Sequence, residues 1–359
     1  MGSTKSTQAR ANPVGRPLVI LARGAYLGLA IVTIFGLSYL LGHSMLGELK
    51  GNDSPLQVAY ALWLEEYFPD LPHWYPLQGG GVSILHGYPI LAHLVVVTLS
   101  RLSGISILQA FRLVGFLCFP LTALGIYFFC WNAFRKQTIG LLAAIFYLLA
   151  PVSWTWMYNW GFFAQQVGLV FLPPALIAFD RALKCQLDKR RAGQGRLWFV
   201  ALTALVVLGS LSHLLIGSAA AAGLVLYTAF LALSSPRASR AGIIRAGVKI
   251  LSRLGLLVVL LTALYVVPFF SYNRIANREG LNDPVPHQLH RLPILEFFGL
   301  RPIDSLEILT RMQFPLAVTA FALTGTILAL LTAPKGDEGS RKAKAWALAS
   351  IAGTAYVLT

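Results

Sequence analysis

The chain has 359 residues, of which 56% are hydrophobic and only 12% are charged, whereas water-soluble domains carry about 25% charged residues. Apolar runs of about 18 residues or more recur along the sequence, and each is long enough to cross a bilayer as a helix. These features exclude a soluble enzyme, a disordered chain and a disulfide scaffold. They also exclude a membrane β-barrel, whose strands alternate apolar and polar residues. The sequence therefore predicts an all-α, polytopic transmembrane helical bundle.

The formal net charge is +15, from 29 Lys and Arg against 14 Asp and Glu. In a soluble protein such an excess would favour a nucleic-acid partner, but in a membrane protein it is typical of cytoplasmic loops. No basic patch is interleaved with aromatic residues in the way that single-strand binders require. We therefore expect the lipid bilayer, and no nucleic acid, as a partner.

A basic tail, residues 1–23, precedes the first apolar segment. The apolar segments that follow are 24–46, 88–100, 106–133, 137–153, 162–180, 197–213, 214–234, 254–272, 313–333 and 345–359. The second is too short for a span before it reaches Arg101, so it predicts an interfacial or re-entrant helix. The last reaches the end of the sequence while still apolar, which favours a truncated span and a C-terminal part that is missing here.

The basic residues distinguish between two topologies. If 88–100 does not span and the N-terminus is cytoplasmic, 21 of the 29 basic residues face the cytoplasm. The cytoplasmic segments are then the tail, residues 135–136 and the loops 181–196, 237–253 and 335–344. If 88–100 spans, the last four of these segments move outside, against the positive-inside rule. The prediction is thus a multi-pass plasma-membrane protein with eight full spans and a truncated ninth over 24–359, and external loops at about 47–106 and 272–312.

The first external loop holds a helix signal. Ser54 as N-cap, Pro55 in the first turn and Gln57 closing a capping box predict a helix start. Apolar residues follow at 56, 59, 60, 63, 64 and 67, which are helical spacings, and the helix is expected to end near Phe68-Pro69. An amphipathic helix beside a span is expected to lie along the membrane interface.

Asp53 immediately precedes this helix. The free N–H groups and the positive end of the helix dipole stabilise a negative charge there. That placement suits a carboxylate base or a cation ligand. The alternative is that Asp53 only helps to cap the helix.

Further short motifs lie in the same loop. They are His73-Trp74-Tyr75-Pro76, Gly79-Gly80-Gly81 and Tyr88-Pro89. Singly, the aromatic residues are typical of interface anchors and the glycines of a turn. Together with Gly51-Asn52-Asp53-Ser54-Pro55 they resemble the first external loop of GT-C type glycosyltransferases. They are most similar to the bacterial and archaeal membrane family labelled "6-pyruvoyl-tetrahydropterin synthase-related", although the sequence lacks the His triad that pterin chemistry needs.

The resemblance implies a GT-C-like bundle that moves a sugar from a polyprenyl-phosphate-type carrier to an acceptor on the outer face. It implies that Asp53 acts as base or binds a metal, and it makes Trp74 and Tyr88 candidate substrate-binding residues. Many members carry a second acidic motif in the next external turn, but here 154–161 has no acidic residue. This departure leaves open whether the protein binds a divalent metal cofactor and whether it is an active transferase.

Other candidates come from the residues themselves. His213 and Gln165 are each either a structural group or a polar group at the mouth of an active-site cavity. Arg274 and Arg278 are four residues apart just beyond a span, so on a continuing helix they would share one face, level with lipid head groups. They predict a site for the phosphate of the lipid carrier. The alternative is a solvated loop whose arginines are neutralised by nearby acids.

Two other functions compete with a transferase. A transporter or flippase would place ionisable residues in mid-membrane and show inverted repeats, and the sequence displays neither. A non-catalytic membrane protein that keeps the fold would explain the missing second acidic motif.

Overall fold

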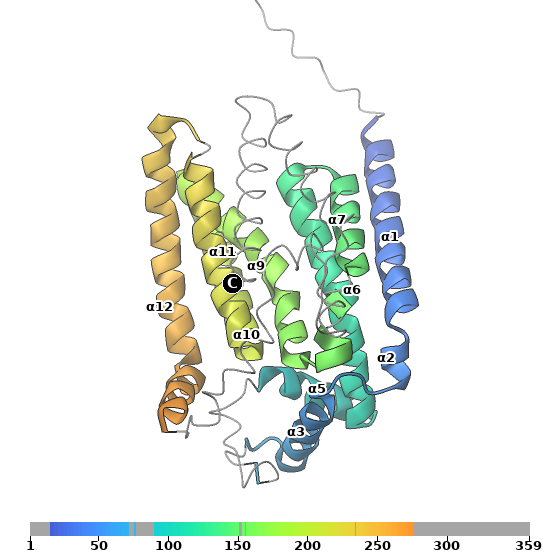
Figure 1. Cartoon of the computed structure of the whole chain (residues 1–359). Coiled ribbons are helices and arrows are strands. Elements are labelled where there is room, and N and C mark those ends of the chain that lie inside the picture. The colour runs from blue at the N-terminus through green and yellow to red at the C-terminus, as the bar shows by residue number, and fades with distance from the viewer. Residues whose placement is uncertain are drawn as a thin grey trace, which may run out of the picture.

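The computed structural model describes residues 15–71, 75–76, 90–150, 153–154, 156–233 and 235–275, and the elements in them are helices (Figure 1). The α-helices are α1 (Gly15–Gly42), α2 (Ser44–Gly47), α3 (Ser54–Tyr67), α5 (Leu91–Ser103), α6 (Ile107–Phe134), α7 (Gln137–Leu149), α9 (Phe163–Leu187), α10 (Ala192–Ser212), α11 (Leu214–Leu233) and α12 (Arg237–Ile275). A π-helix, η1 (Trp156–Trp160), precedes α9, and a short 3₁₀-helix, η2 (Lys189–Arg191), precedes α10. The all-α prediction is confirmed for these residues.

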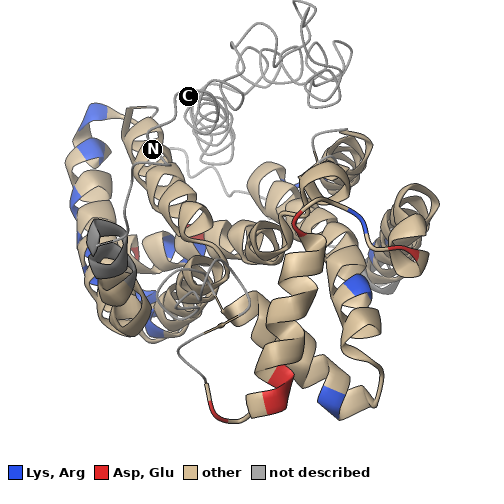
Figure 2. Ribbon diagram, turned by 60° about the horizontal axis from the view of Figure 1, so that its bottom comes forward, with Lys and Arg blue, Asp and Glu red and all other residues tan. Residues whose placement is uncertain are grey.

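Six helices of the described chain are long and apolar enough to cross a membrane. They are contained in α1, α6, α9, α10, α11 and α12. Most of the helical ribbon carries no charged residue (Figure 2), and large apolar side chains such as Val32, Leu197 and Leu264 are exposed on its outside. Large apolar side chains exposed along several long helices need lipid around them. The chain is therefore a multi-pass membrane protein.

The full span predicted over 137–153 is shorter in the structure. Helix α7 has 13 residues and ends at Leu149, with Ala150 extended at its C-cap (φ −71°, ψ 118°). Ala150 precedes a proline, and the proline ring disfavours a helical backbone at the preceding residue. A helix of this length covers about 20 Å, less than the roughly 30 Å hydrocarbon core of a bilayer. The predicted spans 313–333 and 345–359 lie outside the described residues.

The basic loops expected at 181–196 and 237–253 are largely helical, which corrects the sequence interpretation. Helix α9 continues to Leu187, and α12 begins at Arg237 and has 39 residues. A helix of that length is about 58 Å long, so α12 extends well beyond a bilayer core. Hydropathy detects where the apolar surface ends, whereas a helix ends only where a breaking residue or a lost partner ends it.

The helices α3 and α5 lie across one end of the bundle, beside the end of α1 and the start of α9 (Figure 1). Helix α5 contacts α3, α6, α9 and α10. It begins at Leu91, has 13 residues and does not run parallel to the long helices, as expected for an interfacial or re-entrant segment. The prediction that the segment 88–100 would not span agrees with this placement.

Helix α9 connects two apolar cores. The first core surrounds Phe111, Phe119 and Phe163 and joins α1, α3, α5, α6 and α7 to the beginning of α9. The second surrounds Phe179 and Tyr227 and joins the end of α9 to α10, α11 and α12. Because α9 contributes to both, it holds the end of the bundle that carries Asp53 in a defined position relative to the opposite end.

Cysteine labelling in intact cells tests which end is cytoplasmic. In a variant with Cys185→Ser, we expect Arg190→Cys to react with a membrane-impermeant maleimide only after permeabilisation. Asp70→Cys is expected to react at once. Both positions are exposed, so access to the reagent, and not burial, decides the outcome. Labelling of Arg190→Cys but not Asp70→Cys in intact cells would invert the topology.

Candidate functional site

Asp53 lies at a junction between two segments that are far apart in the sequence. The backbone N–H of Asn52 donates to the carbonyl of Asn159 over 3.0 Å, and the N–H of Asp53 donates to the carbonyl of Trp160 over 3.0 Å. We call residues 51–54 and 157–161 together the clasp. The clasp joins the segment that precedes α3 to the aromatic turn that precedes α9.

Two glycines allow the clasp to close. Gly51 (φ +90°) and Gly161 (φ +74°) both adopt left-handed backbone conformations, which side chains disfavour. A Cβ on Gly51 would overlap the backbone of Gly161 and the carbonyl of Met157, and a Cβ on Gly161 would lie 2.6 Å from the N atom of Ser54. Only glycine at both positions lets the two backbones approach this closely.

Asp53 is an exposed residue whose side chain does not cap the helix. Asp53 occupies the N-cap of α3, but its backbone is helical (φ −84°, ψ −12°) and its side chain accepts no cap hydrogen bond. Capping side chains require an extended backbone at this position, so the helper-cap alternative has no supporting hydrogen bond. Asp53 is exposed and forms no ion pair among the described residues.

The capping box predicted for Ser54 and Gln57 is wrong. The hydroxyl of Ser54 donates to the carbonyl of Lys50, and Gln57 Oε1 lies 2.8 Å from His93 Nε2. Both side chains are buried, so they bond inside the protein instead of to the first turn of α3. The predicted Pro55 at the start and the predicted end near Phe68 are both observed.

Polar contacts tie α3 to α5. His93 is fully buried on α5 and packs edge-to-face against Tyr60 as well as bonding Gln57. At the other end of the pair, the Arg101 guanidinium donates to the carbonyl of Glu65 over 2.6 Å and lies over the Phe68 ring. His93 was not among the candidate residues, since a lone histidine in an apolar segment gives no indication of its partner.

The nearest charged groups along the chain neutralise one another. Lys50 forms an ion pair with Glu48. The pKa of the Glu48 carboxyl is lowered, mainly by the hydrogen bond and charge of Lys50 and to a smaller extent by Arg112. Lys50 therefore pairs with Glu48 and not with Asp53.

Gln165 and His213 lie at the same end of the bundle as the clasp. Gln165 is buried in the first turn of α9, beside Gln166, which donates to the carbonyl of Ser153. A Cβ on Gly168 would lie 3.4 Å from the carbonyl of Gly209, so the beginning of α9 packs against the end of α10. His213 follows directly as the C-cap of α10.

The surroundings of His213 favour the neutral form of its imidazole. Its Nδ1 atom is buried and has no hydrogen-bond partner among the described residues. Burial lowers the pKa of His213, because an apolar environment disfavours the charged imidazolium. His213 is thus a neutral polar group near neutral pH.

The other predicted residues lie at or beyond the limits of the described chain. Arg274 belongs to the last turn of α12, which ends on the same side of the molecule as α3 (Figure 1). Arg278, Trp74 and Tyr88 are outside the described residues. Within the described residues, no three His, Cys, Asp or Glu side chains group as metal ligands would.

Comparison with known proteins adds no assignment. Neither a protein-family model, nor a curated protein, nor a solved structure matches this chain.

Proposed function

We propose that this protein is a membrane glycosyltransferase that takes a sugar from a polyprenyl-phosphate-type carrier, with Asp53 as the catalytic base. The observation that supports this proposal is the clasp. It holds Asp53 exposed, with no ion-pair partner among the residues that the structure describes, at the end of a bundle of membrane-spanning helices. A rigidly positioned carboxylate at the lipid surface can meet an acceptor on its aqueous side and a lipid carrier on its membrane side.

The chemistry assigned to Asp53 is general-base catalysis. The carboxylate accepts the proton of an acceptor hydroxyl, and the hydroxyl oxygen attacks the anomeric carbon of the sugar. The bond from that carbon to the phosphate oxygen breaks, and the polyprenyl phosphate leaves with the bonding electrons. Attack opposite the leaving group inverts the anomeric configuration.

The remaining candidates are assigned to binding. Arg274 and Arg278 would hold the carrier phosphate, because guanidinium groups form forked, charge-assisted bonds to phosphate oxygens and stabilise the negative charge that develops there. Trp74 and Tyr88 would stack on the sugar, and Gln165 and neutral His213 would donate hydrogen bonds to its hydroxyls. The resemblance to GT-C enzymes and the position of Arg274 at the Asp53 end of the bundle favour this arrangement.

Replacing the base is the decisive experiment. Asp53→Asn is expected to lower the transfer rate by about 10²–10⁴-fold, the usual cost of losing a general base. The melting temperature should be unchanged, because Asn is nearly isosteric and the Asp53 side chain makes no capping bond. Transfer is measured with the full chain in proteoliposomes, from a panel of radiolabelled polyprenyl-phosphate hexoses to extracted lipid acceptors.

Glu66→Gln provides the matched control, because Glu66 is another exposed carboxylate, at the far end of α3. It should keep wild-type rates. Retention of full activity by Asp53→Asn would remove Asp53 from the mechanism. A wild-type protein that moves no sugar but carries labelled lipid across the bilayer would instead support the flippase alternative.

A further inference from the structure

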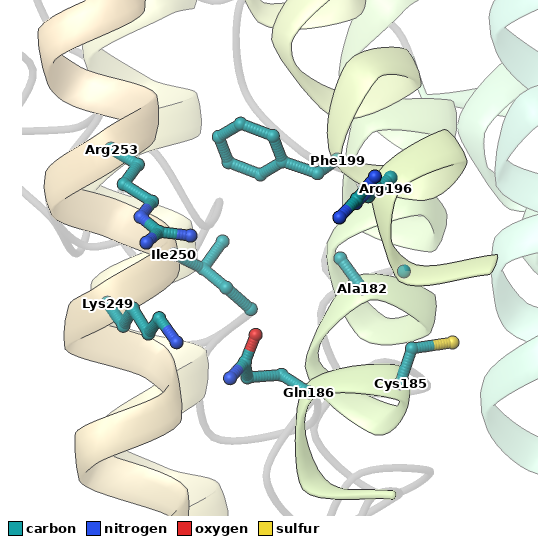
Figure 3. A pocket seen from close by; sticks show the side chains of 9 residues that line it. Ala182, Cys185, Gln186, Arg196, Phe199, Lys249, Ile250 and Arg253 are labelled. Atoms are coloured by element: carbon teal, nitrogen blue, oxygen red, sulfur yellow. The ribbon is translucent and has the colours of Figure 1, made fainter. Parts of the chain in front are cut away.

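A basic cavity lies at the opposite end of α9 from the clasp. It has a volume of about 350 Å³ and opens between α9, α10 and α12 (Figure 3). It is lined by Ala182, Cys185, Gln186, Gly195, Arg196, Phe199, Lys249, Ile250 and Arg253. This volume is within the range of small-molecule sites, roughly 300–1,000 Å³.

Cationic side chains from two helices converge on this cavity. Lys249 and Arg253 extend from α12 toward α9 and α10, and Arg196 faces them from α10 (Figure 3). Gln186 adds an amide from α9. None of the described residues that line the cavity is acidic.

These three cations differ from others at the same end of the bundle. Lys184 is 3.5 Å from Asp180, and Arg191 is 3.3 Å from Asp188. Among the described residues, no ion pair or side-chain hydrogen bond is formed by Arg196, Lys249 or Arg253. Arg196, Lys249 and Arg253 are exposed, so solvent reduces their mutual repulsion without removing it. A bound anion would supply the missing counter-charge.

Local sequence and close helix packing create the arrangement. Lys249 and Arg253 are four residues apart on α12, so they share one helix face. Gly195 lies where an added Cβ would be 3.1 Å from Cys185 Cβ, which lets α10 approach α9 and places Arg196 at the edge of the cavity. Ile250 is buried beside them and fixes the register of α12.

We propose that this cavity binds the phosphate group of an anionic ligand, at a site separate from the transferase site and independent of the proposed function. Arg and Lys together provide forked and point-charge donors to phosphate oxygens, and Gln186 supplies a neutral donor. Basic pockets between membrane helices are a known kind of site for lipid head groups. The exposed apolar residues Leu197, Val200 and Leu256 lie next to the lining residues on α10 and α12 and offer a surface for acyl chains.

Two sources share this chemistry, a phospholipid head group and a free phosphate. The experiment uses the full chain in nanodiscs of phosphatidylcholine and measures binding of short-chain phosphatidic acid and, separately, of inorganic pyrophosphate. The pocket variant is Lys249→Gln/Arg253→Gln. The control is Arg237→Gln/Arg245→Gln, which removes the same charge from exposed positions of the same helix that do not line the cavity.

We expect the pocket variant to bind the phosphate probes at least about tenfold more weakly than wild type, because it loses two charge-assisted contacts. The control should stay within about twofold of wild type. Binding of phosphatidic acid alone would assign the site to a lipid head group, and binding of pyrophosphate as well would assign it to any accessible phosphate. Equal losses in both variants would mean general attraction to a basic surface and would overturn the proposal. Wild-type protein that binds neither probe would overturn it as well.

Discussion

Gly51→Ala is expected to lower the free energy of unfolding by at least about 2 kcal/mol. A left-handed backbone costs a residue with a side chain roughly 1–2 kcal/mol, and Gly51 has φ +90°. The new Cβ would also overlap Gly161 and Met157, so the two backbones must separate and lose the hydrogen bonds from Asn52 and Asp53. The effect is measured as the change in thermal and denaturant unfolding of the purified protein.

Gly104→Ala separates the two causes. Gly104 also has a left-handed backbone (φ +72°), but an added Cβ would meet no atom within 4 Å. This variant should therefore show only the backbone cost, about 1–2 kcal/mol. If Gly51→Ala were no more harmful than Gly104→Ala, the close backbone contact of the clasp would not contribute to stability.

The clasp substitution also bears on the proposed function. Because the clasp positions Asp53, a protein that still folds with Gly51→Ala should lose transfer activity together with the placement of the carboxylate. Asp53→Asn, by contrast, removes the chemistry and leaves the clasp intact. The two variants therefore distinguish a failure of positioning from a failure of catalysis.

Asp180→Leu is expected to destabilise the protein by about 3–5 kcal/mol, the usual cost of removing one partner of a buried charged pair. Asp180 is 2% exposed and accepts a 2.8 Å hydrogen bond from the hydroxyl of Tyr227 on α11. It also forms an ion pair with Lys184 and lies 3.4 Å from Asn132 Nδ2 on α6. The substitution leaves these polar groups without their acceptor at the junction of three helices.

Two further variants calibrate this effect. Asp180→Asn keeps an acceptor for Tyr227 but loses the charge that faces Lys184, so an intermediate loss is expected. Asp188→Asn removes the acid of an exposed pair with Arg191 and should change stability by less than about 1 kcal/mol. Unfolding followed by denaturant titration in one detergent compares all three. Wild-type stability of Asp180→Leu would show that this network does not hold the helices together.

Asp180 also illustrates why a charge in a membrane-spanning helix does not by itself indicate transport. Ionisable residues in such helices are functional candidates by default. Asp180, however, is surrounded by partners on α6, α9 and α11 that account for its burial. This structural role explains why an acidic residue lies at the end of a span, and no transported ion or proton is needed to account for it.

The sequence alone was sufficient to predict that this protein is a helical, multi-pass membrane protein. Long apolar runs with few charges are stable in lipid. In lipid their backbone N–H and C=O groups find no water, and a helix pairs these groups within its own segment. The sequence also predicted that 88–100 would not span, because the run is short. It predicted the beginning and the end of α3 from Pro55 and from the proline after Phe68, whose effects are local. The shortness of α7 has a local cause too, in the proline after Ala150, although hydropathy alone predicted a longer segment.

Only the tertiary structure decided which polar groups meet. Gln57 had a plausible local partner in the first turn of α3 but bonds His93 on another helix. The approach of Gly51 to Gly161 and the convergence of Arg196 with Lys249 and Arg253 join residues separated by many helical turns. A polar side chain has several partners within local reach at similar free energy. Packing of distant helices selects among them, so the class of the protein was readable from the sequence while its clasp and its basic cavity were not.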